Sequence, residues 1–133
     1  MVVMDGEEDK ERNMKVAITA ETGSWDAQVD PRFGRAKCFV VKDNETGEWR
    51  SIPNETNLHA VQGAGIQTAQ NLVQSGVDAV LTGNVGPKAF AALQAAEIKV
   101  YIGVSGTVRE AFEQFEAGSL SPTEDANVEG HWM

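Results

Sequence analysis

The segment GVDAVLTGNVGPKAFAALQAAEIKVYI, residues 76–102, decides the fold class of this chain. Ala79–Leu81 is a short apolar run, typical of a strand that is covered on both faces of a sheet. Pro87 stands where the first turn of a helix tolerates proline, and apolar side chains then recur at helical spacing. Val100–Ile102 is a second apolar run. This strand–helix–strand order requires parallel strands joined by a crossover, so the sequence predicts an α/β fold.

The pattern extends in both directions from this segment. Upstream, Gly65 begins a helical pattern that Gly76 ends as a C-terminal glycine. Downstream, Thr107 and Glu110 have the spacing of a capping box, which predicts a further helix. The remaining strands are expected in three apolar runs, at Val16–Ile18, Cys38–Val41 and Trp49–Ile52. We therefore predict a mixed five-stranded sheet with helices on both faces, in the three-layer arrangement of the ribonuclease H-like fold.

Composition places the chain among globular proteins of one domain. Its 133 residues are 41% hydrophobic and 23% charged, which suits a single hydrophobic core. No apolar run approaches the ~20 residues that span a bilayer, and the N-terminus lacks the pattern of a secretory signal. The single cysteine, Cys38, can form neither an internal disulfide nor a thiolate cage by itself. We therefore expect a cytoplasmic protein with no membrane partner.

The net charge of −9 disfavours nucleic acid as a partner, because phosphate backbones attract basic surfaces. Acidic residues concentrate in 1–13 and 118–133, which we interpret as a disordered extension and a flexible tail around one folded domain, 14–117. Three basic residues, Arg32, Arg35 and Lys37, fall within six positions. In an acidic chain this concentration indicates an anion-binding patch, and the bland alternative is ordinary solvated surface charge.

The candidate site lies where loops leave the carboxyl ends of the predicted parallel strands. Ligands bind at this edge of open α/β sheets, where helix N-termini favour anions and glycine lets the backbone approach a ligand. The predicted cofactor-binding residues are Arg32, Phe33, Gly34, Arg35, His59, Gly63, Gly65, Gly83, Asn84 and Gly86. Glycines at strand–helix junctions are often turn residues only, and that alternative stays open for the glycines of this set.

The sequence shows no recognisable catalytic set. Asp26 and Asp30 could form a carboxylate pair of a metal-dependent nuclease, but the predicted strands carry almost no further acids, and Asp30 before a proline fits turn chemistry. Ser24 and Ser105 lack the base and the orienting acid of a nucleophilic triad. We therefore expect a binding protein without catalytic activity.

Two side chains could ligate a metal directly. His59 lies in a polar loop, where a lone histidine is more often solvated, although imidazole is a common metal ligand. Cys38 lies in an apolar strand, where a free cysteine is usually a small buried hydrophobe. Neither residue indicates which metal would be bound, so the metal stays unknown and both alternatives stay open for each side chain.

Six short motifs occur in order between Met14 and about Phe115. They are Lys15-Val16-Ala17-Ile18, Asp30-x-Arg32-Phe33-Gly34-Arg35-Ala36-x-x-Phe39, Gly63-Ala64-Gly65, Gly76-Val77-Asp78-Ala79-Val80, Gly83-x-x-Gly86-Pro87-x-Ala89 and Ile98-x-Val100. Each motif is weak alone, but the ordered set is specific. It resembles the dinitrogenase iron–molybdenum cofactor biosynthesis family, which includes NifX-like domains and the C-terminal domains of NifB.

The resemblance implies a ribonuclease H-like fold and a carrier of a metal–sulfur cofactor or its precursor. A stand-alone domain with one cysteine is most similar to the orange proteins of sulfate-reducing bacteria, which hold an anionic molybdenum–copper sulfide cluster without a covalent cysteine cage. Nitrogenase members of the family often add domains or cysteines that this chain lacks. The resemblance therefore disfavours a direct role in nitrogen fixation.

The cofactor that the resemblance implies is a metal–sulfur cluster, of the molybdenum–copper sulfide or iron–molybdenum cofactor precursor type, held non-covalently. The implied partners are that cluster and a protein that donates or accepts it, and we expect a monomer. The alternative is a regulatory module that binds a small molecule or nucleotide in the same strand-end crevice.

Overall fold

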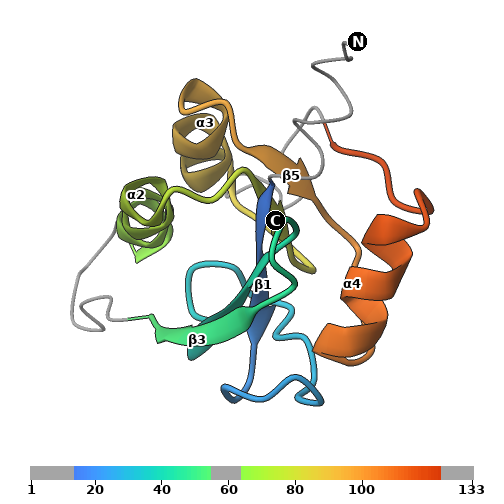
Figure 1. Cartoon of the computed structure of the whole chain (residues 1–133). Coiled ribbons are helices and arrows are strands. Elements are labelled where there is room, and N and C mark those ends of the chain that lie inside the picture. The colour runs from blue at the N-terminus through green and yellow to red at the C-terminus, as the bar shows by residue number, and fades with distance from the viewer. Residues whose placement is uncertain (1–13, 55–63, 124–133) are drawn as a thin grey trace, which may run out of the picture.

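The computed structural model describes residues 14–54 and 64–123 of the chain (Figure 1). The described elements are β1 (Lys15–Ala20), β2 (Cys38–Asp43), β3 (Trp49–Pro53), α2 (Ala64–Ser75), β4 (Ala79–Leu81), α3 (Pro87–Ala95), β5 (Lys99–Tyr101) and α4 (Val108–Glu116). Their order along the chain confirms the one predicted from the sequence. Two of the predicted site residues, His59 and Gly63, lie outside the described residues, as does the extension 1–13. None of the described helices has the length and apolar character needed to cross a membrane.

The strands form a mixed five-stranded sheet in the order β3-β2-β1-β4-β5, as predicted. The central strand β1 pairs parallel with β4, with Ile18 opposite Leu81, and antiparallel with β2, with Ala20 opposite Cys38. β5 continues the parallel part beside β4, and β3 continues the hairpin beside β2. The carboxyl ends of β1, β4 and β5 and the beginning of β2 therefore meet at one edge of the sheet.

Helices cover both faces of this sheet, with α2 and α3 on one side and α4 on the other (Figure 1). Successive residues of a strand point to opposite faces, so β1 contributes to two cores. Ala17 joins the core beneath α2 and α3, whereas Val16 and Ile18 join the core beneath α4. The observed arrangement is thus a three-layer α/β domain.

The sequence signals for helix ends are confirmed where the structure describes them. Pro87 occupies the first turn of α3 after Gly86 as N-cap. Thr107 caps α4 in a capping box, in which its hydroxyl accepts from the Glu110 N–H and its own N–H donates to the Glu110 carboxylate at 2.9 Å. Gly76, with φ of +77°, follows α2 in the left-handed conformation that glycine adopts without strain.

Contacts with the domain continue past Ala117, the last residue of the predicted domain. Leu120 packs against the core beneath α4, and the Thr123 N–H donates to the Val100 carbonyl at 2.7 Å. The polar composition of this stretch predicts a flexible tail, and in the structure one partly buried leucine and one backbone hydrogen bond beside β5 contact the domain. Residues 124–133 lie outside the described part.

Candidate functional site

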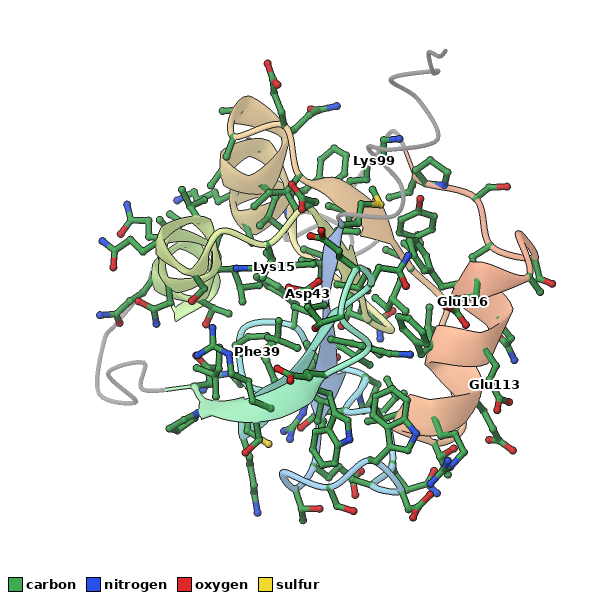
Figure 2. The ribbon with its side chains drawn as sticks, in the orientation of Figure 1. Lys15, Phe39, Asp43, Lys99, Glu113 and Glu116 are labelled. Atoms are coloured by element: carbon green, nitrogen blue, oxygen red, sulfur yellow. The ribbon has the colours of Figure 1, made fainter. Side chains whose placement is uncertain are left out.

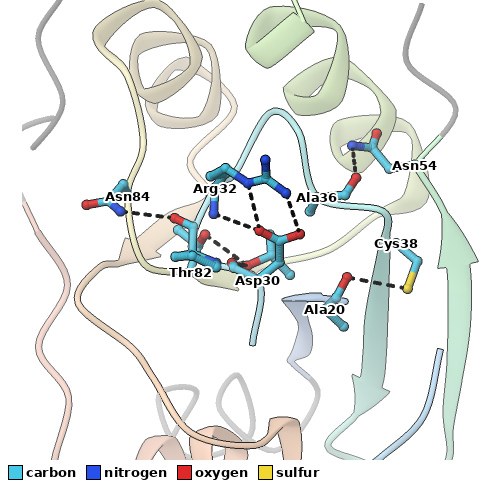
Figure 3. A network of polar contacts seen from close by, with 10 residues as sticks. Ala20, Asp30, Arg32, Ala36, Cys38, Asn54, Thr82 and Asn84 are labelled. Atoms are coloured by element: carbon cyan, nitrogen blue, oxygen red, sulfur yellow. Dashed lines mark hydrogen bonds and ion pairs between the residues drawn. The ribbon is translucent and has the colours of Figure 1, made fainter. Parts of the chain in front are cut away.

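The loop from Asp30 to Ala36 crosses the carboxyl edge of the sheet (Figure 3). The Asp30 N–H donates to the carbonyl of Thr19 in β1 at 2.9 Å. The Phe33 N–H donates to the carbonyl of Asn84 at 3.1 Å, and the Asn84 N–H donates to the carbonyl of Pro31 at 2.8 Å. These bonds join the loop to the end of β1 and to the segment that leaves β4. The structure therefore places Arg32 beside Asn84, and both are predicted site residues.

A buried carboxylate organises the first half of this loop. The Asp30 side chain is only 2% exposed, and its Oδ1 accepts from the Arg32 backbone N–H at 3.0 Å and from the Arg32 Nε at 3.3 Å. The Arg32 side chain itself is 60% exposed. The hydrogen bond from the Arg32 backbone N–H to Asp30 Oδ1 forms an Asx turn. The ion pair with Asp30 holds the guanidinium beside that turn. Arg32 is thus held at its backbone N–H and its Nε by Asp30, while most of its side chain faces solvent.

Two buried threonines support the same turn from beneath. Thr19 and Thr82 are fully buried at the ends of β1 and β4. The Thr19 hydroxyl donates to the Asp30 carbonyl at 2.6 Å, and its oxygen lies 2.9 Å from the Thr82 hydroxyl. Because an unpaired polar group would cost free energy in this interior, these hydroxyls specify where the loop sits.

The second half of the loop is held by α2 and by the end of β3. The Asn54 side-chain amide donates to the Ala36 carbonyl at 2.8 Å (Figure 3). The hydroxyl of Thr68, a buried residue of α2, lies 3.3 Å from the Gly34 carbonyl and 3.2 Å from Asn54 Oδ1, and so can donate to either. The loop is therefore fastened at both ends, with Arg32 and Arg35 between the fastenings.

Two of the predicted glycines, Gly83 and Gly65, lie where another part of the chain comes very close to the backbone. A Cβ on Gly83 would stand 2.8 Å from the Pro31 Cα, so only glycine lets the β4 exit segment contact the loop. A Cβ on Gly65 would stand 3.1 Å from the Ala89 methyl, so Gly65 serves the contact between α2 and α3. Gly86 is the N-cap of α3 in an extended conformation. Gly83 and Gly65 therefore each have a structural reason that is independent of any ligand, whereas the extended backbone of Gly86 does not require glycine.

Phe33 and Arg35 of the loop lie in different environments, one in the core and the other in solvent. Phe33 is 2% exposed and packs near Phe39 in the core beneath α2 and α3, with ring centroids 6.1 Å apart. It can therefore offer a ligand its backbone but not its ring. Arg35 is exposed and makes no ion pair with any described residue. Arg32 is paired with Asp30, whereas Arg35 has no carboxylate partner among the described residues.

Cys38 lies at the same edge but turns away from the loop. It is buried in the core beneath α4, with its Sγ 3.6 Å from the Ala20 carbonyl (Figure 3). Burial raises the pKa of the Cys38 thiol above its usual range, and the negative charge of Asp30 raises it further. At neutral pH the side chain is therefore a protonated thiol and a poor metal ligand, since metals bind the thiolate.

The donor set at this edge suits an anion better than a bare cation. Within residues 14–54 and 64–123, no three His, Cys, Asp or Glu side chains come together as a possible metal-ion site. The exposed charged groups of the loop from Asp30 to Ala36 are the two guanidiniums, and the buried Asp30 offsets part of their charge. Such a site can attract a multiply charged anion through charge and hydrogen bonds without coordinating a metal.

Sequence reasoning missed the residues that hold the loop in place. Asp30 was assigned to turn chemistry, which its Asx turn confirms, but its burial beneath Arg32 was not foreseen. Thr19, Thr82 and Thr68 were not singled out at all. A usable signal was present, because Thr19 and Thr82 are polar residues beside otherwise apolar strand ends at the binding edge.

Comparison with known proteins matches residues 14–118 to the family described as dinitrogenase iron–molybdenum cofactor. The match spans nearly all of the described domain. This chain belongs to that family. The family resemblance carried by the six sequence motifs is therefore confirmed. The family's name concerns the cofactor of dinitrogenase, which places the chain among proteins of cofactor binding and biosynthesis.

Several solved structures resemble this domain. The apo form of the orange protein from Desulfovibrio gigas has a TM-score of 0.84 and 45% identity, and the match covers 86% of this chain and 97% of that protein. A NifB-type protein from Thermotoga has a TM-score of 0.73 and 34% identity, over 86% of this chain and 99% of that protein. A curated relative from Methanocaldococcus jannaschii is 28% identical over 117 residues, which are 86% of this chain and 96% of the relative. The similarity extends over whole proteins rather than over a shared fragment.

Proposed function

We propose that this protein is a non-catalytic carrier of an anionic metal–sulfur cluster, held without covalent bonds at the carboxyl edge of a ribonuclease H-like fold. The cluster would be of the molybdenum–copper sulfide type or a precursor of the iron–molybdenum cofactor. The observation that carries the proposal is the loop from Asp30 to Ala36, which holds two solvent-facing arginines between fixed ends. Family membership supplies the class of guest.

Charge and rigidity support this assignment. An anionic guest gains most from cations that need little reordering when it binds. The ion pair to Asp30 holds Arg32, and the Thr68 and Asn54 contacts hold the backbone on either side of Arg35. The neighbouring exit segment of β4 leads into α3, whose N-terminal dipole favours negative charge. All three features favour an anion at the same edge.

The state of Cys38 supports non-covalent holding. A cluster that brings its own sulfide ligands needs no protein thiolate, and the raised pKa of Cys38 keeps this thiol protonated near neutral pH. The protein would then contribute charge, N–H donors and shape. A partner protein that gives or receives the cluster, a monomeric state and a cytoplasmic location remain parts of the proposal.

The experiment is reconstitution with thiomolybdate and a copper salt, followed by absorption above 400 nm and elemental analysis of the bound metals. We expect Arg35→Glu to reduce loading strongly, because the substitution reverses a positive charge at the proposed site. The loop should stay folded, because Arg35 makes no ion pair with the described residues that the substitution would remove. Lys99→Glu is the matched control, since Lys99 lies at the amino end of β5, away from the candidate edge (Figure 2). Added salt should weaken loading of the parent protein mildly.

Equal loading of folded Arg35→Glu and Lys99→Glu proteins would remove the loop from the site. Protein purified from its native host tests the type of guest, because elemental analysis identifies the metals directly. A colourless native protein whose retained nucleotide is lost in Arg35→Glu would instead favour the alternative of a regulatory small-molecule module at this loop.

A further inference from the structure

A hollow of about 550 Å³ lies on the α4 face of the sheet. It is lined by Ser24, Trp25, Asp26, Lys42, Gly47, Trp49 and Arg109. These residues come from three places in the chain: the segment after β1, the β2–β3 hairpin and the first turn of α4. None of them belongs to the loop from Asp30 to Ala36, so the hollow is separate from the proposed cluster site. Its volume lies within the range of small-molecule sites.

Two tryptophans form one wall of this hollow. Trp25 and Trp49 stack with ring centroids 5.5 Å apart and planes at 27°. Trp25 packs on the core beneath α4 and lies 5.8 Å from the Phe112 ring, so packing explains its position. Trp49 is 43% exposed, and together with Val73 it is one of the large hydrophobic side chains that the described surface leaves open. The stack on Trp25 covers part of the Trp49 ring, and Trp49 also lines the hollow.

A lysine without a counter-charge lies beside these rings. The Lys42 Nζ stands 3.9 Å from the centroid of the Phe112 ring and 5.5 Å from that of Trp25. It makes no ion pair with any residue of the described segments. Lys42 lies directly opposite Trp49 in the hairpin register, so both side chains leave the sheet on the same face. The ammonium rests on aromatic faces and can pair with an anionic group at the hollow.

The other charges that line the hollow largely cancel. The Arg109 guanidinium lies 5.9 Å from the Trp25 ring centroid and pairs with Asp26 at 2.9 Å. Glu113 also acts electrostatically on Arg109, so the cation of the lining that has no carboxylate partner among the described residues is Lys42, beside an open indole. A ligand complementary to it combines a flat ring, which can stack on an aromatic face, with an anionic group.

We propose that this hollow binds a planar aromatic anion of the nucleotide type. Its ring would stack on Trp49, and its phosphate would lie at the Lys42 ammonium with Arg109 nearby. The walls are held in place before binding, because the Arg109 N–H donates to the Trp25 carbonyl at 3.0 Å and the Val108 N–H donates to the Ala27 carbonyl at 2.8 Å. Rigid aromatic walls reduce the entropy lost on binding.

The test uses adenosine monophosphate, adenosine and inorganic phosphate as three separate probes. Each is titrated into ¹⁵N-labelled protein while the indole N–H signals are followed by NMR, and affinities are measured by calorimetry. We expect adenosine monophosphate to shift the Trp25 and Trp49 signals and to bind more tightly than either of its two parts. Lys42→Gln and Trp49→Ala should each weaken its binding roughly tenfold, as expected for a lost charged contact or stacking surface.

The control variants are Lys99→Gln, which removes a lysine at the amino end of β5, and Trp49→Phe, which keeps an aromatic face. Both should bind nearly as the parent does. Arg35→Glu should also leave this binding unchanged, which separates it from cluster loading. Absence of shifts at millimolar adenosine monophosphate would overturn the proposal. So would equal binding of inorganic phosphate, equal binding by Lys42→Gln, or shifts confined to the loop from Asp30 to Ala36.

Discussion

Asp30 and Arg32 form an ion pair that joins the interior of this domain to solvent. The carboxylate is 2% exposed and the guanidinium is 60% exposed. The same Asp30 Oδ1 also accepts the Arg32 backbone N–H, and the Asp30 carbonyl accepts the Thr19 hydroxyl. One buried residue thus sets the turn, the direction of the cation and the contact with β1. This arrangement makes the candidate site depend on a residue that no ligand needs to touch.

We expect Asp30→Asn to destabilise the protein by about 1–3 kcal/mol, because the amide keeps the acceptor for the Arg32 N–H but loses the charged partner of the guanidinium. Urea unfolding measures this change. Hydrogen exchange of the Phe33 amide, which bonds to Asn84, should also become faster. Asp26→Asn is the matched control, since the Asp26–Arg109 pair is exposed on both sides and should barely affect unfolding. Equal effects of the two substitutions would contradict the role given to Asp30.

Gly83→Ala should displace the loop, since its methyl would stand 2.8 Å from the Pro31 Cα and backbone atoms cannot move aside cheaply. Overpacking of this kind typically costs about 1–3 kcal/mol. Gly65→Ala is the graded comparison, because its methyl would meet only the Ala89 methyl at 3.1 Å and alanine also favours the helix. Thermal unfolding of both variants should place Gly83→Ala below Gly65→Ala. The reverse order would show that the Gly83–Pro31 contact does not hold the loop.

Cys38→Ala should still load the cluster, because the thiol packs in the core beneath α4 and stays protonated near neutral pH. Visible absorption and bound metal per protein measure loading, with circular dichroism as the check of folding. Complete loss of cluster from a folded Cys38→Ala protein would make Cys38 a ligand. His59→Ala, at a position outside the described residues, is expected to have the larger effect if its loop lines the site.

The thiol also predicts a pH dependence of stability. Its pKa is raised in the folded protein, so its contribution is fully present below the unfolded value of about 8.5 and is lost as the pH rises through the folded value. The unfolding free energy of the parent protein should therefore fall relative to that of Cys38→Ala above this pH. Paired denaturant titrations between neutral and alkaline pH measure the difference. A constant difference would mean that the thiol titrates alike in both states.

Truncation distinguishes the two parts of the C-terminal segment. Deleting 119–133 should lower the melting temperature more than deleting 124–133, because only the longer deletion removes Leu120 and the Thr123–Val100 hydrogen bond. Loss of one partly buried leucine corresponds to about 1 kcal/mol. Matching melting curves for the two truncated proteins would restore the boundary that the sequence suggested.

The sequence by itself determined the order of the elements and the mixed sheet, and it predicted the edge at which the candidate site lies. Those features depend on short-range patterns: the apolar run before Thr82, Pro87 in a first turn, and the Thr107–Glu110 capping box. Neighbours within a few residues decide such hydrogen bonds and periodicities, so they can be inferred without knowing the rest of the fold.

The tertiary structure alone decided which polar residues hold the site and which side chains face solvent. Thr19 meets Thr82 across 63 positions, and Thr68 meets the loop at Gly34 across 34 positions. It also buried Phe33, placed Leu120 on the core and brought Trp25 against Trp49. The physical reason is that burial and long-range hydrogen bonding depend on what the folded chain brings together, and a polar or aromatic residue has no fixed environment until that packing exists.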